Sequence, residues 1–131
     1  MTPLLWIVVK MGIVTWLALL LASLMRAKGW TLPGLLLALG NRDNLPAPSD
    51  MAGRASRASV NTLEAFVLFA PLALVAHAAA AANPHVLLGA QIFFWSRLAY
   101  LAVYVAGIAY LRTLVWGVSY AGLIMMIMGL G

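Results

Sequence analysis

Four long apolar stretches dominate the sequence and leave few folds open to it. They run over roughly Leu4–Met25, Val60–Ala82, Val86–Ala109 and Thr113–Leu130. A helix needs about 20 mostly apolar residues to cross the hydrocarbon core of a bilayer, so each stretch is long enough to span. None of them alternates with the period of two that marks a strand of a membrane β-barrel. The sequence therefore predicts an all-α, integral membrane four-helix bundle.

The composition favours the same class of protein. Of the 131 residues, 65% are hydrophobic and 8% are charged, whereas about 25% of residues are charged in a typical soluble domain. Four spans leave little chain for a separate soluble domain, so residues 1–131 are expected to form a single domain. The sequence has no Cys, which excludes disulfides, zinc–thiolate sites and cysteine nucleophiles. Any thiol chemistry therefore needs a thiol supplied by a ligand.

The distribution of basic residues predicts how the chain is oriented. The connection between the first two spans, residues 26–59, contains Arg26, Lys28, Arg42, Arg54 and Arg57. Arg112 lies between the last two spans, whereas the turn at residues 83–85 and both chain ends carry no Lys or Arg. The positive-inside rule then places the first and third loops in the cytoplasm and both termini on the non-cytoplasmic side.

Two of the predicted helices carry polar stripes. The stripe on the second helix consists of Arg54, Arg57, Asn61 and Glu64, and the stripe on the third consists of Arg97, Tyr100 and Tyr104. At 100° per residue, these sets fall within arcs of about 80° and about 60°. The sequence therefore predicts two polar faces in the cytoplasmic half of the membrane.

Among these residues, Arg97 has the highest free-energy cost of placement in the membrane, because it lies about 18 Å from the cytoplasmic end of its helix. An arginine inside a membrane normally faces the bundle interior and has a partner. One interpretation is that Arg97 pairs with Glu64, the only carboxylate in any span, and only holds the helices together. For the other residues of the stripes, the structural alternatives are contacts of the arginines with lipid headgroups and an aromatic belt of tyrosines.

Two segments resemble a known family. Residues 57–66, Arg-Ala-Ser-Val-Asn-Thr-Leu-Glu-Ala-Phe, are similar to the R-A-x-x-N-x-x-E-x-F signature of the MAPEG family, the membrane-associated proteins in eicosanoid and glutathione metabolism. Residues 97–119, RLAYLAVYVAGIAYLRTLVWGVS, resemble the third helix, third loop and fourth helix of that family. The resemblance covers essentially the whole chain and is greatest to the short bacterial members. It implies a homotrimer in the bacterial inner membrane, with glutathione bound between subunits near the cytoplasmic side.

The resemblance also implies the residues of the glutathione site. The positions that match family contacts are Arg54, Arg57, Asn61, Glu64, Arg97, Tyr100 and Tyr104. Arg112 is the nearest match to the arginine that stabilises the thiolate, although its spacing from Tyr104 differs from that in well-studied members. The leukotriene-forming enzyme has a tyrosine after the glutamate, where this chain has Ala65.

The chemistry of glutathione suits these residue types. Glutathione carries two carboxylates, one ammonium group and a thiol. Arginine binds carboxylates through its planar fork, Glu64 can take the ammonium group, and Asn61, Tyr100 and Tyr104 can bind amide groups or the thiol. A thiol has a pKa near about 8.5 and attacks as the thiolate, so a nearby cation such as Arg112 can activate it.

Three functions remain open at this point. The first is a glutathione S-transferase that acts on a lipophilic electrophile, or a peroxidase that reduces a lipid hydroperoxide. The second is a non-catalytic scaffold or lipid-binding protein that retains the fold. The third is a small transporter, which would need polar residues to continue beyond Arg97. Membrane lipids and other copies of the chain are the expected partners, and neither nucleic acid nor a metal is expected.

A few further residues carry specific expectations. Lys10 lies inside the first span and is expected to snorkel toward the non-cytoplasmic surface. His77 and His85 are too isolated to form a metal site. Ser49 or Asp50 is expected to cap the helix that follows. The apolar piece Leu35–Leu39 is too short to cross the membrane and is expected at its interface.

Overall fold

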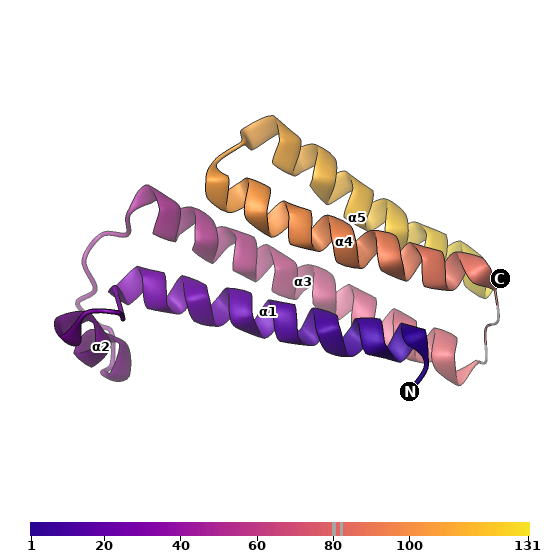
Figure 1. Cartoon of the computed structure of the whole chain (residues 1–131), viewed down its shortest axis with the longest axis horizontal. Helices are drawn as coiled ribbons and strands as arrows, with labels where there is room; N and C mark the ends of the chain where they lie inside the picture. The colour runs from indigo at the N-terminus through magenta and orange to yellow at the C-terminus, as the bar shows by residue number, and fades with distance from the viewer. Residues whose placement is uncertain (80, 82) are drawn as a thin grey trace.

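The computed structural model describes residues 1–79, 81 and 83–131. Within these residues the chain is helical and forms α1 (Pro3–Ala27), α2 (Leu32–Leu39), α3 (Asp50–Ala78), α4 (Pro84–Ala106) and α5 (Ala109–Leu130). The four long helices run side by side, α2 lies at one end, and both termini lie at the opposite end (Figure 1). This arrangement fits a chain that crosses the bilayer an even number of times.

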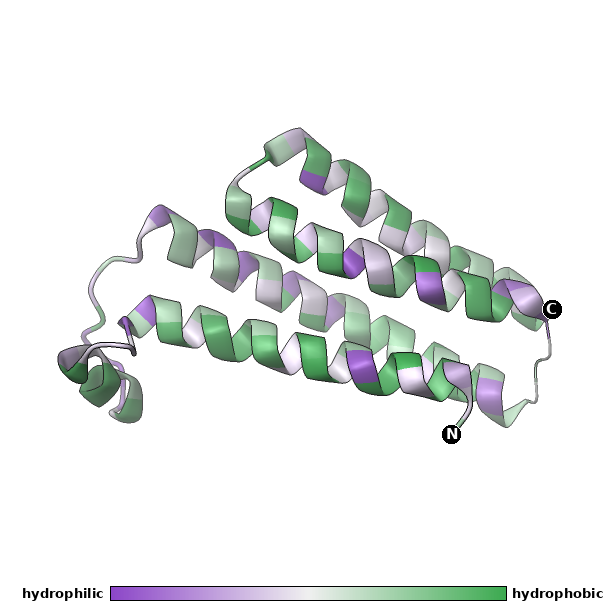
Figure 2. Cartoon of the chain, viewed as in Figure 1, coloured by the Kyte–Doolittle hydropathy of each residue, from purple (hydrophilic) through white to green (hydrophobic). Residues whose placement is uncertain are grey.

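Four of the helices are long and apolar enough to cross a membrane, and they correspond to the four stretches expected from the sequence. Hydrophobic residues cover most of their length (Figure 2). Large apolar side chains such as Trp16, Leu21, Leu74 and Met128 are exposed on the outside of the bundle. In water such a surface would promote aggregation, whereas in a bilayer it is the surface that contacts lipid.

The second long helix begins ten residues before the predicted span Val60–Ala82. Ser49 is its N-cap, as predicted, because its Oγ accepts the backbone N–H of Ala52 at 3.1 Å. The helix ends at Ala78, and residues 80 and 82 of the predicted span lie outside the described part of the chain. As a result, Arg54 and Arg57 are on the same continuous helix as Asn61 and Glu64.

The boundary between α4 and α5 differs from the prediction in a way that affects the site. Gly107 has φ +84° and ends α4, a conformation that glycine adopts without the steric cost of a side chain. Only Ile108 separates it from α5, which starts at Ala109. The expected loop before Thr113 is therefore helical, and Arg112 lies in the first turn of α5 instead of in a connection between spans.

The connection from α1 to α3 is held against the end of α1. Arg42 donates hydrogen bonds to the carbonyl of Ala38 and to the Oγ of Ser23, at 3.0 and 2.7 Å. Arg26 donates to the carbonyl of Pro46. These bonds fix the start of α3 beside α1. The apolar piece Leu35–Leu39 that the sequence predicted is part of the helix α2. Its position at the membrane interface stays a prediction.

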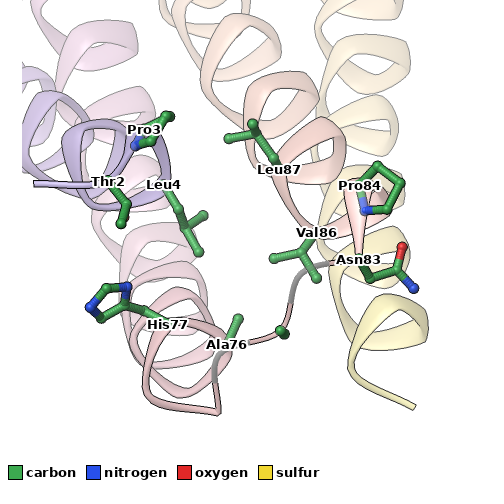
Figure 3. A pocket seen from close by; sticks show the side chains of 10 residues that line it. Thr2, Pro3, Leu4, Ala76, His77, Asn83, Pro84, Val86 and Leu87 are labelled. Atoms are coloured by element: carbon green, nitrogen blue, oxygen red, sulfur yellow. The ribbon is translucent and has the colours of Figure 1, made fainter.

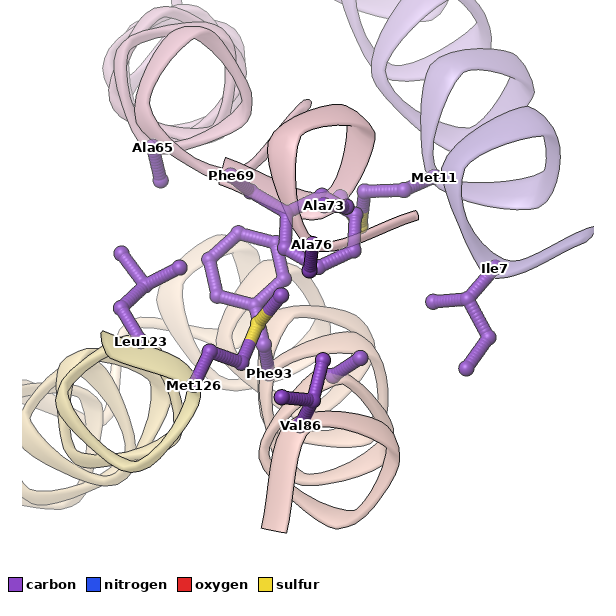
Figure 4. Close-up of a cluster of buried hydrophobic side chains, with 11 residues drawn as sticks. Ile7, Met11, Ala65, Phe69, Ala73, Ala76, Val86, Phe93, Leu123 and Met126 are labelled. Carbon is purple, nitrogen blue, oxygen red and sulfur yellow. The ribbon is translucent and has the colours of Figure 1, made fainter. Parts of the chain in front are cut away.

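The buried core lies in the half of the bundle that contains the chain termini. Met11 of α1, Phe69 of α3, Phe93 of α4 and Met126 of α5 point toward one another (Figure 4) and are fully buried. The rings of Phe69 and Phe93 stack with centroids 4.5 Å apart. Because lipid tails are as apolar as these side chains, close packing is what favours contact between the helices over contact with lipid.

Two glycines bring α4 and α5 unusually close together. A Cβ atom on Gly122 would lie 2.6 Å from the carbonyl oxygen of Gly89, and a Cβ atom on Gly89 would lie 2.5 Å from that of Gly122. Both distances are shorter than van der Waals contact allows, so no larger residue fits here without movement of the backbone. Small residues at helix contacts are a common feature of membrane bundles. The pair fixes the position of α5, and with it Arg112 and Ser119, beside the polar stripe of α4.

Candidate functional site: a polar pocket between α3 and α4

Arg97 lies at the centre of a polar network inside the bundle. Its side chain is 0% exposed, and its Nη2 donates hydrogen bonds to the Oδ1 of Asn61 and the Oγ1 of Thr62, both at 2.9 Å. Its Nη1 donates to the Oγ of Ser119 on α5 at 3.5 Å. The ring of Tyr100 lies beneath the guanidinium group, with its centroid 4.1 Å from Cζ.

The ion pair between Arg97 and Glu64 that the sequence suggested is wrong. The partners of Arg97 among the described residues are neutral oxygens, and Glu64 is exposed. The packing of α3 on α4 places Asn61 and Thr62 at the level of Arg97, whereas Glu64 lies further along α3 on an exposed face. In the described part of the chain, the Nε of Arg97 has no hydrogen-bond partner. The network therefore holds a positive charge without a buried carboxylate to neutralise it.

A second network links α3, α4 and α5. Arg57 on α3 donates a hydrogen bond from Nε to the hydroxyl oxygen of Tyr104 on α4, at 3.1 Å. Arg112 lies over the ring of the same tyrosine, with Cζ 4.4 Å from the ring centroid, a distance typical of a cation–π contact. The ring of Tyr104 also meets that of Tyr100 edge to face, with centroids 5.5 Å apart. Tyr104 thus lies between two guanidinium groups.

Side chains from the polar stripes of α3 and α4 form the walls of a pocket of about 390 Å³. Its lining residues are Ser56, Arg57, Val60, Asn61, Glu64, Tyr100 and Tyr104. Five of them were predicted from the sequence as parts of two stripes, and the pocket brings those stripes together. Its volume lies within the range of about 300–1,000 Å³ that is common for small-molecule sites.

The other three predicted site residues lie around this pocket and do not line it. Arg97 is buried behind Asn61 and Tyr100. Arg112 lines a smaller pocket of about 160 Å³ together with Tyr100, Thr113 and Trp116. Because Tyr100 is part of both linings, the two pockets are neighbours.

Arg54 has a different partner. Its Nε donates a hydrogen bond to the carbonyl of Val105 at 3.0 Å, and its Cζ lies 3.3 Å from where a Cβ of Gly107 would be. Cations near the last carbonyl groups of a helix are stabilising. Arg54 therefore secures the end of α4, and a direct contact of Arg54 with a ligand stays a prediction.

Sequence reasoning missed Thr62 and Ser119, the two hydroxyl partners of Arg97. Thr62 directly follows Asn61, Ser119 is a small polar residue in a mostly apolar stretch, and neither lies in the stripe that the periodicity defines. The available signal was chemical: a buried arginine requires acceptors, and few acceptors exist in these spans.

The charges around the pocket favour an anionic ligand. Arg57, Arg97 and Arg112 lie on or directly behind its walls, whereas Glu64 is the single acid among the lining residues. Both Arg57 and Glu64 are exposed on the surface of the isolated subunit. Charged groups within a membrane span normally face protein or a polar cavity. This face of α3 is therefore unsuited to contact with lipid.

A further pocket, of about 450 Å³, lies at the opposite end of the bundle and is lined from three helices (Figure 3). Thr2 is the N-cap of α1, Leu4 comes from the start of that helix, His77 from the end of α3, and Val86 from the start of α4. Its lining is mostly apolar and lacks the groups of opposite charge found near Tyr104. Size alone does not identify a functional site, and the chemistry favours the smaller pocket.

The comparison with known protein families supports the resemblance. The model of the MAPEG family matches residues 3–131, essentially the whole chain. The chain belongs to the MAPEG family. No curated protein and no solved structure matches it.

Membership of the MAPEG family agrees with the four apolar helices, so the predicted family and the all-α membrane bundle are both confirmed. The protein is a multi-pass membrane protein. In segment 57–66, the three polar positions that match the family signature, Arg57, Asn61 and Glu64, all line the pocket. The segment that carries the resemblance and the candidate site thus coincide.

Proposed function

We propose that the polar pocket binds glutathione and that the protein is a membrane-embedded glutathione S-transferase. The observation that carries this proposal is the position of Tyr104 between Arg57 and Arg112, on the wall of a pocket that also contains Glu64 and Asn61. Membership of the MAPEG family supports it, because the family includes glutathione transferases.

The donors and acceptors around the pocket fit the groups of glutathione. The guanidinium group of Arg57 suits a carboxylate, and Glu64 suits the ammonium group. The Oδ1 of Asn61 already accepts a hydrogen bond from Arg97. The amide nitrogen of Asn61 is therefore left to donate to a ligand carbonyl or carboxylate. The three nearby arginines and the single acid match a ligand with more negative than positive charges.

Tyr104 and Arg112 are suited to hold a thiolate. The Tyr104 hydroxyl accepts the hydrogen bond of Arg57, so its own proton remains free to be donated. Arg112, above the same ring, adds a positive charge at low effective dielectric. A hydrogen bond to the sulfur and a nearby cation both lower the pKa of a thiol. Arg112 is therefore the candidate activating residue.

Glutathione, when bound, supplies the sulfur that forms a bond to carbon of the electrophile, while the thiol proton is lost to water. At the same carbon either a leaving group departs with its bonding electrons, or the electron pair of a double bond moves onto the neighbouring atom, which then takes a proton from water. The electrophile, or a lipid hydroperoxide, would enter from the bilayer. The exposed charges of Arg57 and Glu64 would be covered by a neighbouring subunit, so a homotrimer would complete the pocket. The proposed location is the bacterial inner membrane, with both termini on the non-cytoplasmic side.

Titration of the detergent-purified protein with glutathione tests this proposal. The readout is the ultraviolet absorbance of the thiolate near neutral pH, and Arg112→Ala and Glu64→Gln serve as variants. We expect a saturable signal in the wild type, loss of the signal in Arg112→Ala and weaker binding in Glu64→Gln. Binding without any thiolate signal would refute the activating role of Arg112. No binding at all would refute the glutathione site and favour a non-catalytic scaffold or lipid-binding protein.

A further inference from the structure

A separate groove lies on the side of the bundle formed by α1 and α4. It measures about 400 Å³ and is lined by Pro3, Trp6, Ile7 and Lys10 of α1 and by Gln91, Phe94 and Trp95 of α4. It shares no lining residue with the pocket near Tyr104. A ligand in this groove would therefore contact none of the residues that line the proposed glutathione site.

Lys10 is a charged residue inside a span, and the chain offers it no nearby anion. The sequence contains three acidic residues. Asp43 and Asp50 lie in and next to the connection at the opposite end of the bundle, and Glu64 lines the polar pocket between α3 and α4. In the described part of the chain, every hydrogen bond between two side chains involves Arg42, Arg57 or Arg97. No acidic side chain of this subunit therefore serves as a partner for Lys10, and a molecule at the membrane surface can supply one.

The groove leads from Lys10 to the end of the bundle. Lys10 is seven residues after Pro3, the first residue of α1, which corresponds to about 10 Å along the helix axis. Side chains on a helix lean toward its N-terminus, and a lysine can extend further to place its ammonium group near the membrane surface. Because the lining includes Pro3 as well as Lys10, an anionic group at that surface can approach the ammonium group.

The polar groups of the lining are suited to an oxyanion. Trp6 and Trp95 are 50% and 66% exposed, and their indole N–H groups can donate but not accept. Gln91 contributes an amide group that can donate, and Lys10 contributes an ammonium group. Between these donors, Ile7 and Phe94 provide apolar surface. A ligand that combines several anionic oxygens with a hydrocarbon chain matches this pattern.

We propose that the groove between α1 and α4 binds an anionic phospholipid, with its phosphate group at Lys10 and an acyl chain along Ile7 and Phe94. A phosphate suits the site because its several oxygens can accept from separate donors on two helices. Basic pockets between membrane helices recognise anionic headgroups by the same physics. The lipid belongs to the leaflet at the N-terminal end of α1.

Native mass spectrometry of the detergent-purified protein tests this assignment. The probes are phosphatidylglycerol and phosphatidylcholine with identical acyl chains, added at equal concentration to the wild type, Lys10→Gln, Lys10→Arg and Lys28→Gln. Lys28 is the matched control, because it is the other lysine of the chain and lies at the opposite end of α1. We expect about fivefold weaker phosphatidylglycerol binding in Lys10→Gln, the fold-change for about 1 kcal/mol per basic residue at an anionic surface. Lys10→Arg and Lys28→Gln should bind as the wild type does.

Equal binding of phosphatidylglycerol by the wild type and Lys10→Gln would overturn the proposal, as would equal binding of the two lipids by the wild type. Preferential binding of oleate in a competition with phosphatidylglycerol would show that the groove selects a carboxylate, and would overturn the phosphate assignment. A changed number of subunits in Lys10→Gln, without a change in lipid binding, would show that the anion comes from another copy of the chain.

Discussion

The Nε of Arg57 donates a hydrogen bond to the hydroxyl oxygen of Tyr104 across the contact between α3 and α4, at 3.1 Å. This bond joins the two polar stripes and orients the phenol at the wall of the pocket. Arg112 lies over the aromatic ring of Tyr104, with its Cζ 4.4 Å from the ring centroid. Residues from three helices therefore control the position and the electrostatic environment of one hydroxyl group.

Tyr104→Phe should raise the pKa of the bound glutathione thiol while retaining most of the binding. The variant keeps the ring beneath Arg112 and removes the hydroxyl that can donate to the sulfur. A hydrogen bond to a charged group contributes about 1.5–3 kcal/mol, so we expect the thiol pKa to rise by about one to two units. At neutral pH the thiolate fraction then falls, since the group is deprotonated only at higher pH.

A pH titration of thiolate absorbance at saturating glutathione measures this pKa shift. Tyr110→Phe is the matched control, because Tyr110 is 93% exposed and lies outside the linings of both pockets near Arg112. An unchanged titration curve in Tyr104→Phe would show that the hydroxyl does not contact the sulfur.

Substitutions around Arg97 should separate the effect of its network on the stability of the bundle from the effect on glutathione binding. Thr62→Val removes an acceptor of Nη2 and leaves a buried donor with one partner fewer, which costs about 1–3 kcal/mol. Arg97→Met removes the buried charge together with its need for acceptors, so it should cost less stability than Thr62→Val. Arg97→Met also releases the Oδ1 of Asn61, so glutathione should bind more weakly.

Thermal unfolding in detergent and glutathione titration together check this pair of variants. Thr62→Ser, which keeps the hydroxyl, is the control for the loss of stability. The network has no role in orienting Asn61 if Arg97→Met binds glutathione as tightly as the wild type.

The sequence allowed the helices and the polar stripes to be predicted, because both depend on local patterns. The four apolar stretches and the Ser49 cap required only hydropathy and capping rules. The partners of Arg97 depend instead on the register between α3 and α4 and on the approach of Ser119 from α5. The register is a property of packing, so the single carboxylate of the spans, Glu64, was a reasonable but wrong candidate partner. Likewise, the position of Arg112 in α5 follows from the sharp end of α4 at Gly107.

Gly122→Ala should destabilise the packing of α5 on α4. Its Cβ would lie 2.6 Å from the carbonyl oxygen of Gly89 and 2.9 Å from the backbone N of Phe93, so the helices must separate. Loss of close contact along the helix interface should cost about 1–3 kcal/mol. Gly117→Ala in the same helix is the matched control, because no atom lies within 4 Å of its added methyl group. Gly117→Ala should be neutral or stabilising because alanine favours a helix more than glycine does.

The temperature at which half of the protein loses its helical circular dichroism in detergent is the measurement. The expected order is Gly122→Ala below the wild type, and Gly117→Ala equal to it or above. If both variants unfold at the same temperature, the close approach of Gly89 and Gly122 does not stabilise the bundle.

Glu64→Gln should abolish the preference of the pocket for a ligand with a free amino group. Glu64 is the only acid that lines the pocket, and in the described part of the chain Arg97 is held by neutral groups instead of by this carboxylate. Its charge is therefore available to a ligand ammonium group. We expect the wild type to bind glutathione about tenfold more tightly than N-acetylglutathione, which lacks that charge, a difference of about 1.4 kcal/mol. Glu64→Gln should bind the two ligands about equally, because the attraction to the ammonium group is lost.

Competition binding of both ligands to both proteins gives the coupling between the carboxylate and the amine directly, since effects on folding cancel in the cycle. An undiminished preference in Glu64→Gln would mean that the amino group binds elsewhere, for example at a group from a neighbouring subunit.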